Sequence, residues 1–229
     1  KRAYWSLSSS LIITFIVFVV FSLTQGLIAF ILHTASEVTL EKVLYSQLGL
    51  ISTISSVIGI LIIMLFVKYK NNSIKNYLNL HLPNIKTSLI LIFLFFCLIA
   101  IMELLSDYYP DIFYTDFVIE SYRQTNNLPV FYLGVVFLGP IFEEFLFRGF
   151  LFKGIEKSPM GGKGAVFISA ILFALVHIQY GFYILLFMIF PLALLLGYAR
   201  LKSGSLLLPI LLHSINNLVT CLVTHFEIY

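Results

Sequence analysis

Long apolar runs separated by short polar segments divide this chain into seven segments, each long enough to form a membrane-spanning helix. The runs lie near residues 7–33, 42–68, 86–105, 129–155, 162–178, 182–200 and 204–226. Crossing a hydrocarbon layer of about 30 Å takes roughly 20 helical residues, and about 17 at the short end. The pattern therefore predicts an all-α fold, a polytopic membrane bundle of about seven transmembrane helices.

Composition and charge placement support this membrane topology. Apolar residues make up 60% of the 229 residues and charged residues only 11%. Basic residues favour the cytoplasmic side of a membrane. With the N-terminus inside, only Lys42 and Arg123 fall on external segments. The cytoplasmic segments, with the adjoining span ends, then hold Lys1, Arg2, Lys68, Lys70, Lys75, Lys86, Lys153, Lys157, Lys163, Arg200 and Lys202. We therefore predict a cytoplasmic N-terminus.

The remaining composition limits the partners and the domain count. The formal net charge of +3 follows from the predicted orientation, so we expect lipid headgroups rather than nucleic acid beside the basic loops. The longest external segment, residues 106–127, carries Asp107, Asp111, Asp116 and Glu120 among aromatic residues. We expect it to form an acidic surface element or a helix that lies on the membrane interface. We expect a single integral membrane domain over residues 1–229. Cys97 and Cys221 fall within spans and are expected to be small buried residues, not a disulfide.

Two adjacent glutamates and an arginine occur inside the fourth apolar run, in the segment Glu143-Glu144-Phe-Leu-Phe-Arg148. Each charged side chain at a helix centre in lipid costs about 2.5–3.5 kcal/mol, so such residues persist where they are partnered inside a bundle. Glu144 and Arg148 share a helix face and predict a structural ion pair. Glu143 points about 100° away and needs a partner from another helix.

Two further polar pairs lie on the later spans. His177 follows Phe173 by four residues in the fifth run, and His213 precedes Asn217 by four residues in the seventh. Residues four apart on a helix project from the same face. Either pair could be catalytic, or could simply join helices by hydrogen bonds worth about 0.6 kcal/mol each in membrane proteins. The small residues Ser52, Ser55, Ser56 and Gly59 indicate close helix packing in the second run.

The ordered motifs Glu-Glu-x-x-x-Arg, Phe-x-x-x-His and His-x-x-x-Asn on successive spans resemble those of the CPBP family. This family comprises the type II CAAX prenyl endopeptidases and their bacteriocin-processing and Abi-type relatives. The resemblance covers about residues 129–220, the expected catalytic core, whereas residues 1–105 supply spans without a motif. It implies an intramembrane protease that cleaves membrane-associated or small precursor peptides, and we expect a multi-pass enzyme of a bacterial cell membrane.

The resemblance also implies roles for the six motif residues. Glu143 would activate water, and His177 would hold or polarise that water. His213 and Asn217 would stabilise the oxyanion, which needs hydrogen-bond donors aimed at the developing charge. Glu144 and Arg148 would set the position of Glu143. Arg148 could alternatively bind a substrate carboxylate, since a guanidinium group suits that partner.

A metal-dependent mechanism is the main alternative within this family. Two glutamates and two histidines could supply a zinc site with an open position. The chain lacks His-Glu-x-x-His, the helical spacing of zinc proteases, and the resemblance favours water held by protein groups alone. We therefore predict no cofactor, with zinc as the alternative.

Other functions and one geometrical conflict stay open at this stage. Intramembrane Glu and His residues could form the relay of a proton-coupled transporter or channel, and a non-catalytic immunity protein could retain the same fold. Straight spanning helices would place Glu143 near mid-membrane but His177 near the external end. We expect the fifth helix to tilt or to end inside the bundle, with Gln179, Tyr180 and Gly181 lining a cavity.

Overall fold

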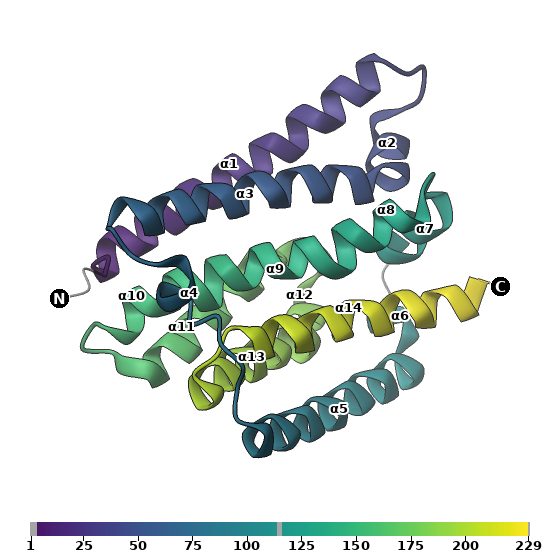
Figure 1. The fold of residues 1–229 in the computed structure, drawn as a ribbon. Coiled ribbons are helices and arrows are strands. Elements are labelled where there is room, and N and C mark those ends of the chain that lie inside the picture. Colours follow the sequence, from purple (N-terminus) through teal and green to yellow (C-terminus); the bar gives the residue numbers. More distant parts are fainter. Residues whose placement is uncertain (1–3, 114–115, 229) are drawn as a thin grey trace.

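The computed structural model describes residues 4–113 and 116–228, which form helices joined by short turns (Figure 1). Long helices dominate the N-terminal half: α1 (Leu7–Thr34), α3 (Leu48–Tyr69) and α5 (Ile85–Tyr108). Short helices lie between them and after them: α2 (Leu40–Ser46), α4 (Ile74–Tyr77), α6 (Pro110–Phe113) and α7 (Asp116–Gln124).

The C-terminal half contains a long segmented helix and three further helical regions. The segmented helix comprises α8 (Leu128–Tyr132), the π-helix η1 (Leu133–Leu138), α9 (Gly139–Glu144), the π-helix η2 (Phe145–Leu151) and α10 (Phe152–Glu156). The others are α11 (Gly161–Leu175), the 3₁₀ turn η3 (Ile178–Tyr180), α12 (Phe182–Ile184), the π-helix η4 (Leu185–Ile189), α13 (Phe190–Ser203) and α14 (Leu207–Ile228).

The predicted all-α membrane bundle is confirmed. Within the described residues, six helical regions are long and apolar enough to span a membrane: Leu7–Thr34, Leu48–Tyr69, Ile85–Tyr108, Leu128–Glu156, Phe182–Ser203 and Leu207–Phe226. The fifth predicted span, 162–178, corresponds to α11, which has only 15 residues. The second span begins later than predicted, because the chain turns at Gln47 and residues 40–46 form the separate helix α2.

Polar side chains begin several of these helices by capping free backbone N–H groups. Ser6 accepts a hydrogen bond from the backbone of Ser9 at the start of α1, and Asn84 accepts from Lys86 and Thr87 at the start of α5. Asn127 accepts from Val130 at the start of α8. Such caps satisfy N–H groups that have no partner inside the helix.

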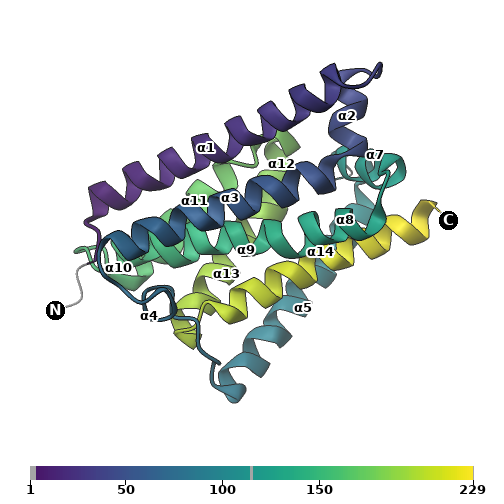
Figure 2. The same ribbon diagram turned by 45° about the horizontal axis from the view of Figure 1, so that its top comes forward.

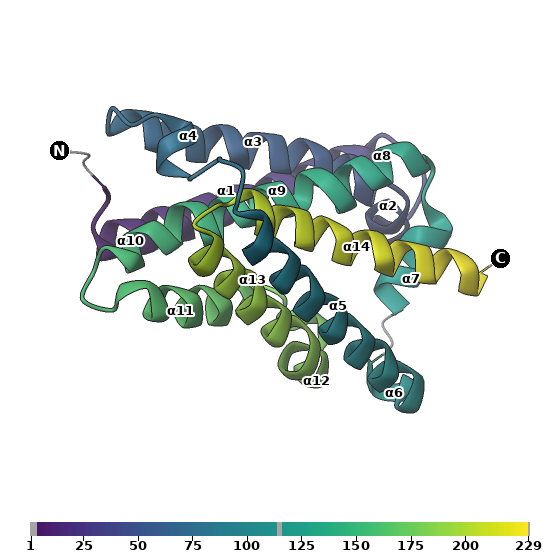
Figure 3. The ribbon, with the colours of Figure 1, turned by 60° about the horizontal axis from the view of Figure 1, so that its bottom comes forward.

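The segmented helix α8–α10 occupies the middle of the bundle. It lies between α3 and α14, and α1 packs against both α3 and the η2 and α10 parts of the central helix (Figures 1 and 2). Helices α11 and α13 pack against each other, and α5 lies at the edge beside α13 and α14 (Figure 3). The central position of α8–α10 explains why Glu144, Arg148 and their neighbours in η2 are buried.

Small residues let α3 approach the central helix closely, as the sequence predicts. Ser52, Ser55, Ser56 and Gly59 are buried in this contact. The Phe142 ring lies against Gly59, where a Cβ atom would collide with it. Gly49 similarly lies against the Phe131 backbone. Membrane helices commonly use small residues for such contacts.

The outer faces of the long helices are apolar. Phe15, Leu23, Leu65 and Phe93 are among the most exposed side chains of α1, α3 and α5, as expected for surfaces in contact with lipid. Cys97 lies on such a face and is exposed, so the prediction that both cysteines are buried is wrong for Cys97 and correct for Cys221. The reason is that α5 packs on the bundle by one side only.

Candidate active site

Glu144 and Arg148 form the buried ion pair predicted from their spacing. Arg148 Nη1 donates to Glu144 Oε1 at 3.0 Å, and both side chains are fully buried. Arg148 Nη2 donates to the Ala193 carbonyl at 3.0 Å, and the guanidinium lies 4.3 Å from the centre of the Phe173 ring. Arg148 thus joins η2 to α13 and α11, and has no exposed surface with which to meet a substrate carboxylate.

Glu143 points away from this pair, toward two histidines from other helices. Its Oε2 lies 3.7 Å from His213 Nε2 and 4.0 Å from His177 Nε2. The Glu143 side chain is 25% exposed, whereas that of Glu144 is not exposed at all. The central helix, the turn after α11, and α14 therefore bring three polar side chains to one point that remains accessible.

The second nitrogen of each imidazole is held by another group. His177 Nδ1 lies 2.8 Å from the Phe173 carbonyl, which can only accept, so this nitrogen carries a proton. His213 Nδ1 lies 3.0 Å from Glu144 Oε1, which also accepts from Arg148. These partners assign the proton of each neutral ring to Nδ1 and leave both Nε2 atoms directed at Glu143.

Helix α11 ends early, which brings His177 to the depth of Glu143. At about 1.5 Å per residue, 15 residues span only about 22 Å. The chain then turns through His177 and η3 to Gly181, whose φ of 91° and ψ of 160° belong to a region that only glycine adopts readily. The expectation that the fifth helix ends inside the bundle is confirmed.

Tyr180 completes this turn; the sequence predicts it only as a residue that lines a cavity, without a contact to the motif residues. Its ring stacks on His177, with centroids 6.1 Å apart and planes inclined by 17°. On its other side Phe117 contacts it edge-on. Burial, and to a smaller extent the charge of Glu143, raise the pKa of Tyr180 to about 12. Its phenol therefore keeps its proton near Glu143. A tyrosine in a polar turn gives no sequence signal for this role.

Asn217 binds to the central helix at a point where the backbone hydrogen bonding of that helix is interrupted. Gly139 N–H bonds to the Gly134 carbonyl, five residues back, in the π-helical pattern. The Val135 carbonyl would pair next with residue 140, but Pro140 has no N–H to give. Asn217 Nδ2 donates to this carbonyl instead, at 2.9 Å. Its Oδ1 accepts from Asn216 at 3.2 Å.

Arg200 is a second buried arginine, and its predicted place in a cytoplasmic loop is wrong. Only 1% of its surface is exposed. Its Nε donates to the Arg148 carbonyl at 3.1 Å, and its guanidinium lies 5.4 Å from the centre of the Phe152 ring. The side chain extends inward from the last turns of α13 because backbone carbonyls of η2 offer acceptors there. Arg200 thereby supports the segment that carries Arg148.

Several donor atoms at this point are of types that bind metal ions. Imidazole Nε2 atoms with a carboxylate oxygen are ligands that zinc accepts, and Nδ1 atoms held by carbonyl or carboxylate groups are common behind such ligands. However, no group of three or more His, Cys, Asp or Glu side chains in the described part of the chain has the geometry to hold a metal ion. Zinc therefore stays the alternative to a mechanism without a metal.

Of the six predicted site residues, five form one connected cluster: Glu143, Glu144, Arg148, His177 and His213. Asn217 lies one turn beyond His213 on α14, bound to Val135. The arrangement contains a partly exposed carboxylate beside two imidazole nitrogens, within a largely buried set of charges. Such a set can accept a proton from a water molecule and pass it on.

Comparison with known families agrees with this geometry. The family model of the Rce1-like type II CAAX prenyl endopeptidases matches residues 125–219, from just before α8 into α14, and so includes all three motifs. Searches of curated proteins and of solved structures found no match. Together with the six apolar helices, the match makes this a multi-pass membrane protein. Residues 125–219 thus match a family of type II CAAX prenyl endopeptidases, in agreement with the resemblance of the three motifs to the CPBP family.

Proposed function

We propose that this protein is an intramembrane endopeptidase in which Glu143 activates the attacking water. The observation that carries the proposal is the convergence of Glu143 Oε2 with the Nε2 atoms of His177 and His213, at 4.0 and 3.7 Å. Both imidazoles have their Nδ1 atoms engaged elsewhere, so Nε2 is available for chemistry. The match to a protease family supports the reaction type.

A water molecule between Glu143 and His177 would be well placed for attack. Two acceptors 4.0 Å apart can each take one hydrogen of the same water at a normal hydrogen-bond distance of about 2.8 Å. The lone pair of that water is then free for the carbonyl carbon. Glu143 would take one proton as the new C–O bond forms. It would return that proton to the amide nitrogen as the C–N bond breaks.

His213 is suited to stabilise the oxyanion in its doubly protonated form. Its Nδ1–H would donate to Glu144 and its Nε2–H to the oxyanion, and the carboxylates of Glu143 and Glu144 would stabilise the positive ring. Asn217 uses Nδ2 to hold Val135, and the second hydrogen on the same nitrogen would be its donor. A single oxyanion donor is worth about 10²–10³-fold in kcat.

Glu144 and Arg148 position these groups and do not react in this proposal. Glu144 orients His213 through Nδ1, and Arg148 fixes Glu144 and the Ala193 backbone. We propose no cofactor, with zinc as the alternative that the experiment below must exclude. The substrates would be membrane-associated or small precursor peptides, such as secreted or signalling peptides of a bacterial cell, entering from the bilayer or through the opening beside Glu143.

Cleavage of a membrane-peptide library by purified wild type and Glu143→Gln, each with and without a strong chelator, tests this proposal. Glu143→Gln is expected to lower the rate by about 10²–10⁴-fold, the typical contribution of a general base, and the chelator to have no effect. The matched control is Glu156→Gln, which removes a glutamate that pairs with Lys153 on α10 and is expected to keep full activity.

The other outcomes are equally specific. Equal cleavage by wild type and Glu143→Gln would overturn the assignment of the base. Chelator-sensitive cleavage would move the same residues into a zinc site. Glu143-dependent proton flux into vesicles without any peptide cleavage would favour the transporter alternative.

A further inference from the structure

A cavity lies between α5 and α14, apart from the candidate active-site cluster. It has a volume of about 220 Å³ and is bounded by α5, α6, α7, η4, α13 and α14. This volume is below the roughly 300–1,000 Å³ of typical small-molecule sites. The cavity therefore has room for one or two side chains of a larger molecule.

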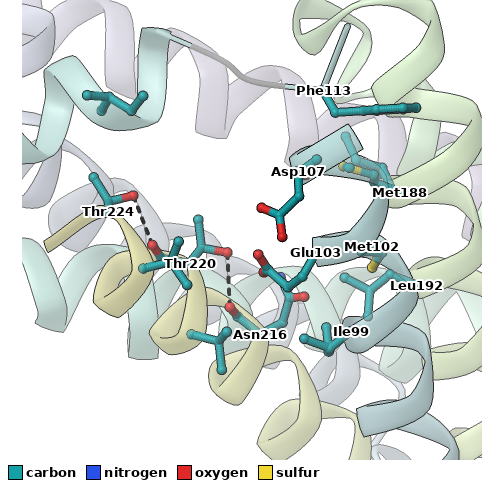
Figure 4. Close-up of a pocket in the computed structure, with 15 residues that line it drawn as sticks. Ile99, Met102, Glu103, Asp107, Phe113, Met188, Leu192, Asn216, Thr220 and Thr224 are labelled. Carbon is teal, nitrogen blue, oxygen red and sulfur yellow. Dashed lines mark hydrogen bonds between the residues drawn. The ribbon is translucent and has the colours of Figure 1, made fainter. Parts of the chain in front are cut away.

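The walls of this cavity combine apolar surface with carboxylates. Met102, Met188 and Leu192 are among its apolar residues. Glu103 and Asp107, one turn apart on α5, point into the opening opposite Asn216 and Thr220 of α14 (Figure 4). None of the described residues that line it is a lysine, arginine or histidine. The cavity thus presents negative charge on an apolar surface.

The position of Glu103 makes this charge unusual. Glu103 lies five residues before the end of α5, an apolar helix able to span a membrane, which is about 7.5 Å along the helix axis. An ionisable residue at such a depth indicates a functional site by default. An amphipathic cation with a long apolar stem, such as the side chain of lysine or arginine, complements both the apolar wall and the carboxylates.

Two connections join the cavity to the reactive groups. Asn216 lines the cavity and donates to Oδ1 of Asn217 at 3.2 Å. On the other side, Phe113 of α6 lines the cavity, while Phe117 of α7 packs edge-on against Tyr180, which stacks on His177. A side chain in the cavity would therefore contact the same helix and the same external segment that hold the candidate active site.

We propose that this cavity binds a basic side chain of the peptide substrate, at a position away from the bond that is cut. The inference deepens the proposed function, on which its biological meaning rests, by naming the substrate class as peptides with a lysine or arginine beside apolar residues. Glu103 and Asp107 are then specificity residues that act on binding and take no part in activating the water.

Binding can be measured without any cleavage. The full chain carrying Glu143→Gln, in phosphatidylcholine nanodiscs, is titrated with two fluorescent probes, dansyl-Leu-Lys-Leu amide and dansyl-Leu-norleucine-Leu amide. The lysine probe should bind about five- to tenfold more tightly, as expected for a cation beside two partly exposed carboxylates. Equal binding of the two probes would overturn the proposal.

Variants of the cavity carboxylates test whether the preference for the lysine probe arises in the cavity. Glu103→Gln and Asp107→Asn should each lower the lysine preference by about two- to threefold, and the double variant should abolish it. Asp111→Asn on α6 removes one exposed charge outside the cavity and should leave the preference intact. Unchanged affinity for the norleucine probe shows that each variant is folded. A lysine preference that survives in the double variant would overturn the assignment.

Two further measurements distinguish this proposal from lipid binding and from the proposed protease function. Loss of probe binding when phosphatidylcholine is replaced by phosphatidylethanolamine would assign the cavity to a lipid amine and overturn the peptide proposal; unchanged binding supports it. A lysine preference in a protein that shows no Glu143-dependent cleavage would support the cavity and reject the proposed protease function. The two proposals can thus fail separately.

Discussion

Glu143 and Glu144 are adjacent in the chain but have different surroundings. Glu144 is fully buried between Arg148 and His213, whereas Glu143 is partly exposed and faces two Nε2 atoms. The 100° rotation between successive helical residues predicts this division from the sequence alone. Tyr180 and Arg200 were not predictable, because the position of each depends on a turn or a carbonyl in another part of the fold.

The buried pair predicts an asymmetry in stability. Arg148→Met leaves the Glu144 carboxylate without its main counter-charge, so it should destabilise the protein by about 3–5 kcal/mol. Removing both charges, in Glu144→Gln with Arg148→Met, should cost less than the single Arg148 change. Thermal unfolding in detergent measures both variants. A double variant less stable than Arg148→Met would contradict this account.

At the level of helices, length and apolar runs predict the spans well, but the internal irregularities are not predictable from the pattern. The fourth span contains two π-helical segments, and a third begins the sixth span. Apart from Arg148, the side chains of these segments are apolar or absent, so the hydrophobic pattern does not change where the hydrogen-bond register does. The sequence signals only one of these irregularities. Pro140 has no N–H, so the Val135 carbonyl in the first π-helical segment is available to Asn217.

The turn after α11 depends on one glycine. Gly181 has a φ of 91°, and a Cβ atom there would meet no other atom within 4 Å, so Gly181→Ala tests backbone strain alone. We expect a loss of about 1–3 kcal/mol in stability, with reduced cleavage because His177 and Tyr180 share this turn. Gly26→Ala in α1, also without a neighbour within 4 Å, is the control and should be neutral or slightly stabilising. Equal behaviour of the two variants would contradict the role of this turn.

For the whole molecule, the sequence correctly predicts a helical membrane bundle and the half that carries the motifs. The arrangement of the helices within the bundle is known only from their packing in the structure. Which helix lies centrally, and which faces meet lipid, follow from small residues on α3 and from the buried charges of the central helix. Orientation across the membrane stays a prediction. It rests on basic residues that include Lys1 and Arg2, which lie outside the described residues. The side chain of Asp116 also lies outside them.

Labelling of single cysteines tests that orientation. In a chain with Cys97 and Cys221 replaced by serine, Arg123→Cys should react with a membrane-impermeant maleimide added to intact cells, because Arg123 is exposed on the predicted external side. Lys157→Cys, exposed between α10 and α11, should react only after the cells are opened. The reverse pattern would place the N-terminus outside.

Residue 217 supplies the hydrogen bond that the Val135 carbonyl does not receive from its own helix. A titratable side chain at this position would therefore make the stability of the protein depend on pH. An aspartate there could hold this carbonyl only as the neutral acid, because its ionised form has no hydrogen to donate. Asn217→Asp should therefore be most stable at acidic pH and lose thermal stability as the pH rises, while the wild type shows no such added dependence. A stability of the variant that does not fall between about pH 5 and pH 8 would contradict this reading. One substitution would thus turn a structural clamp into a reporter of proton access to the interior of the bundle.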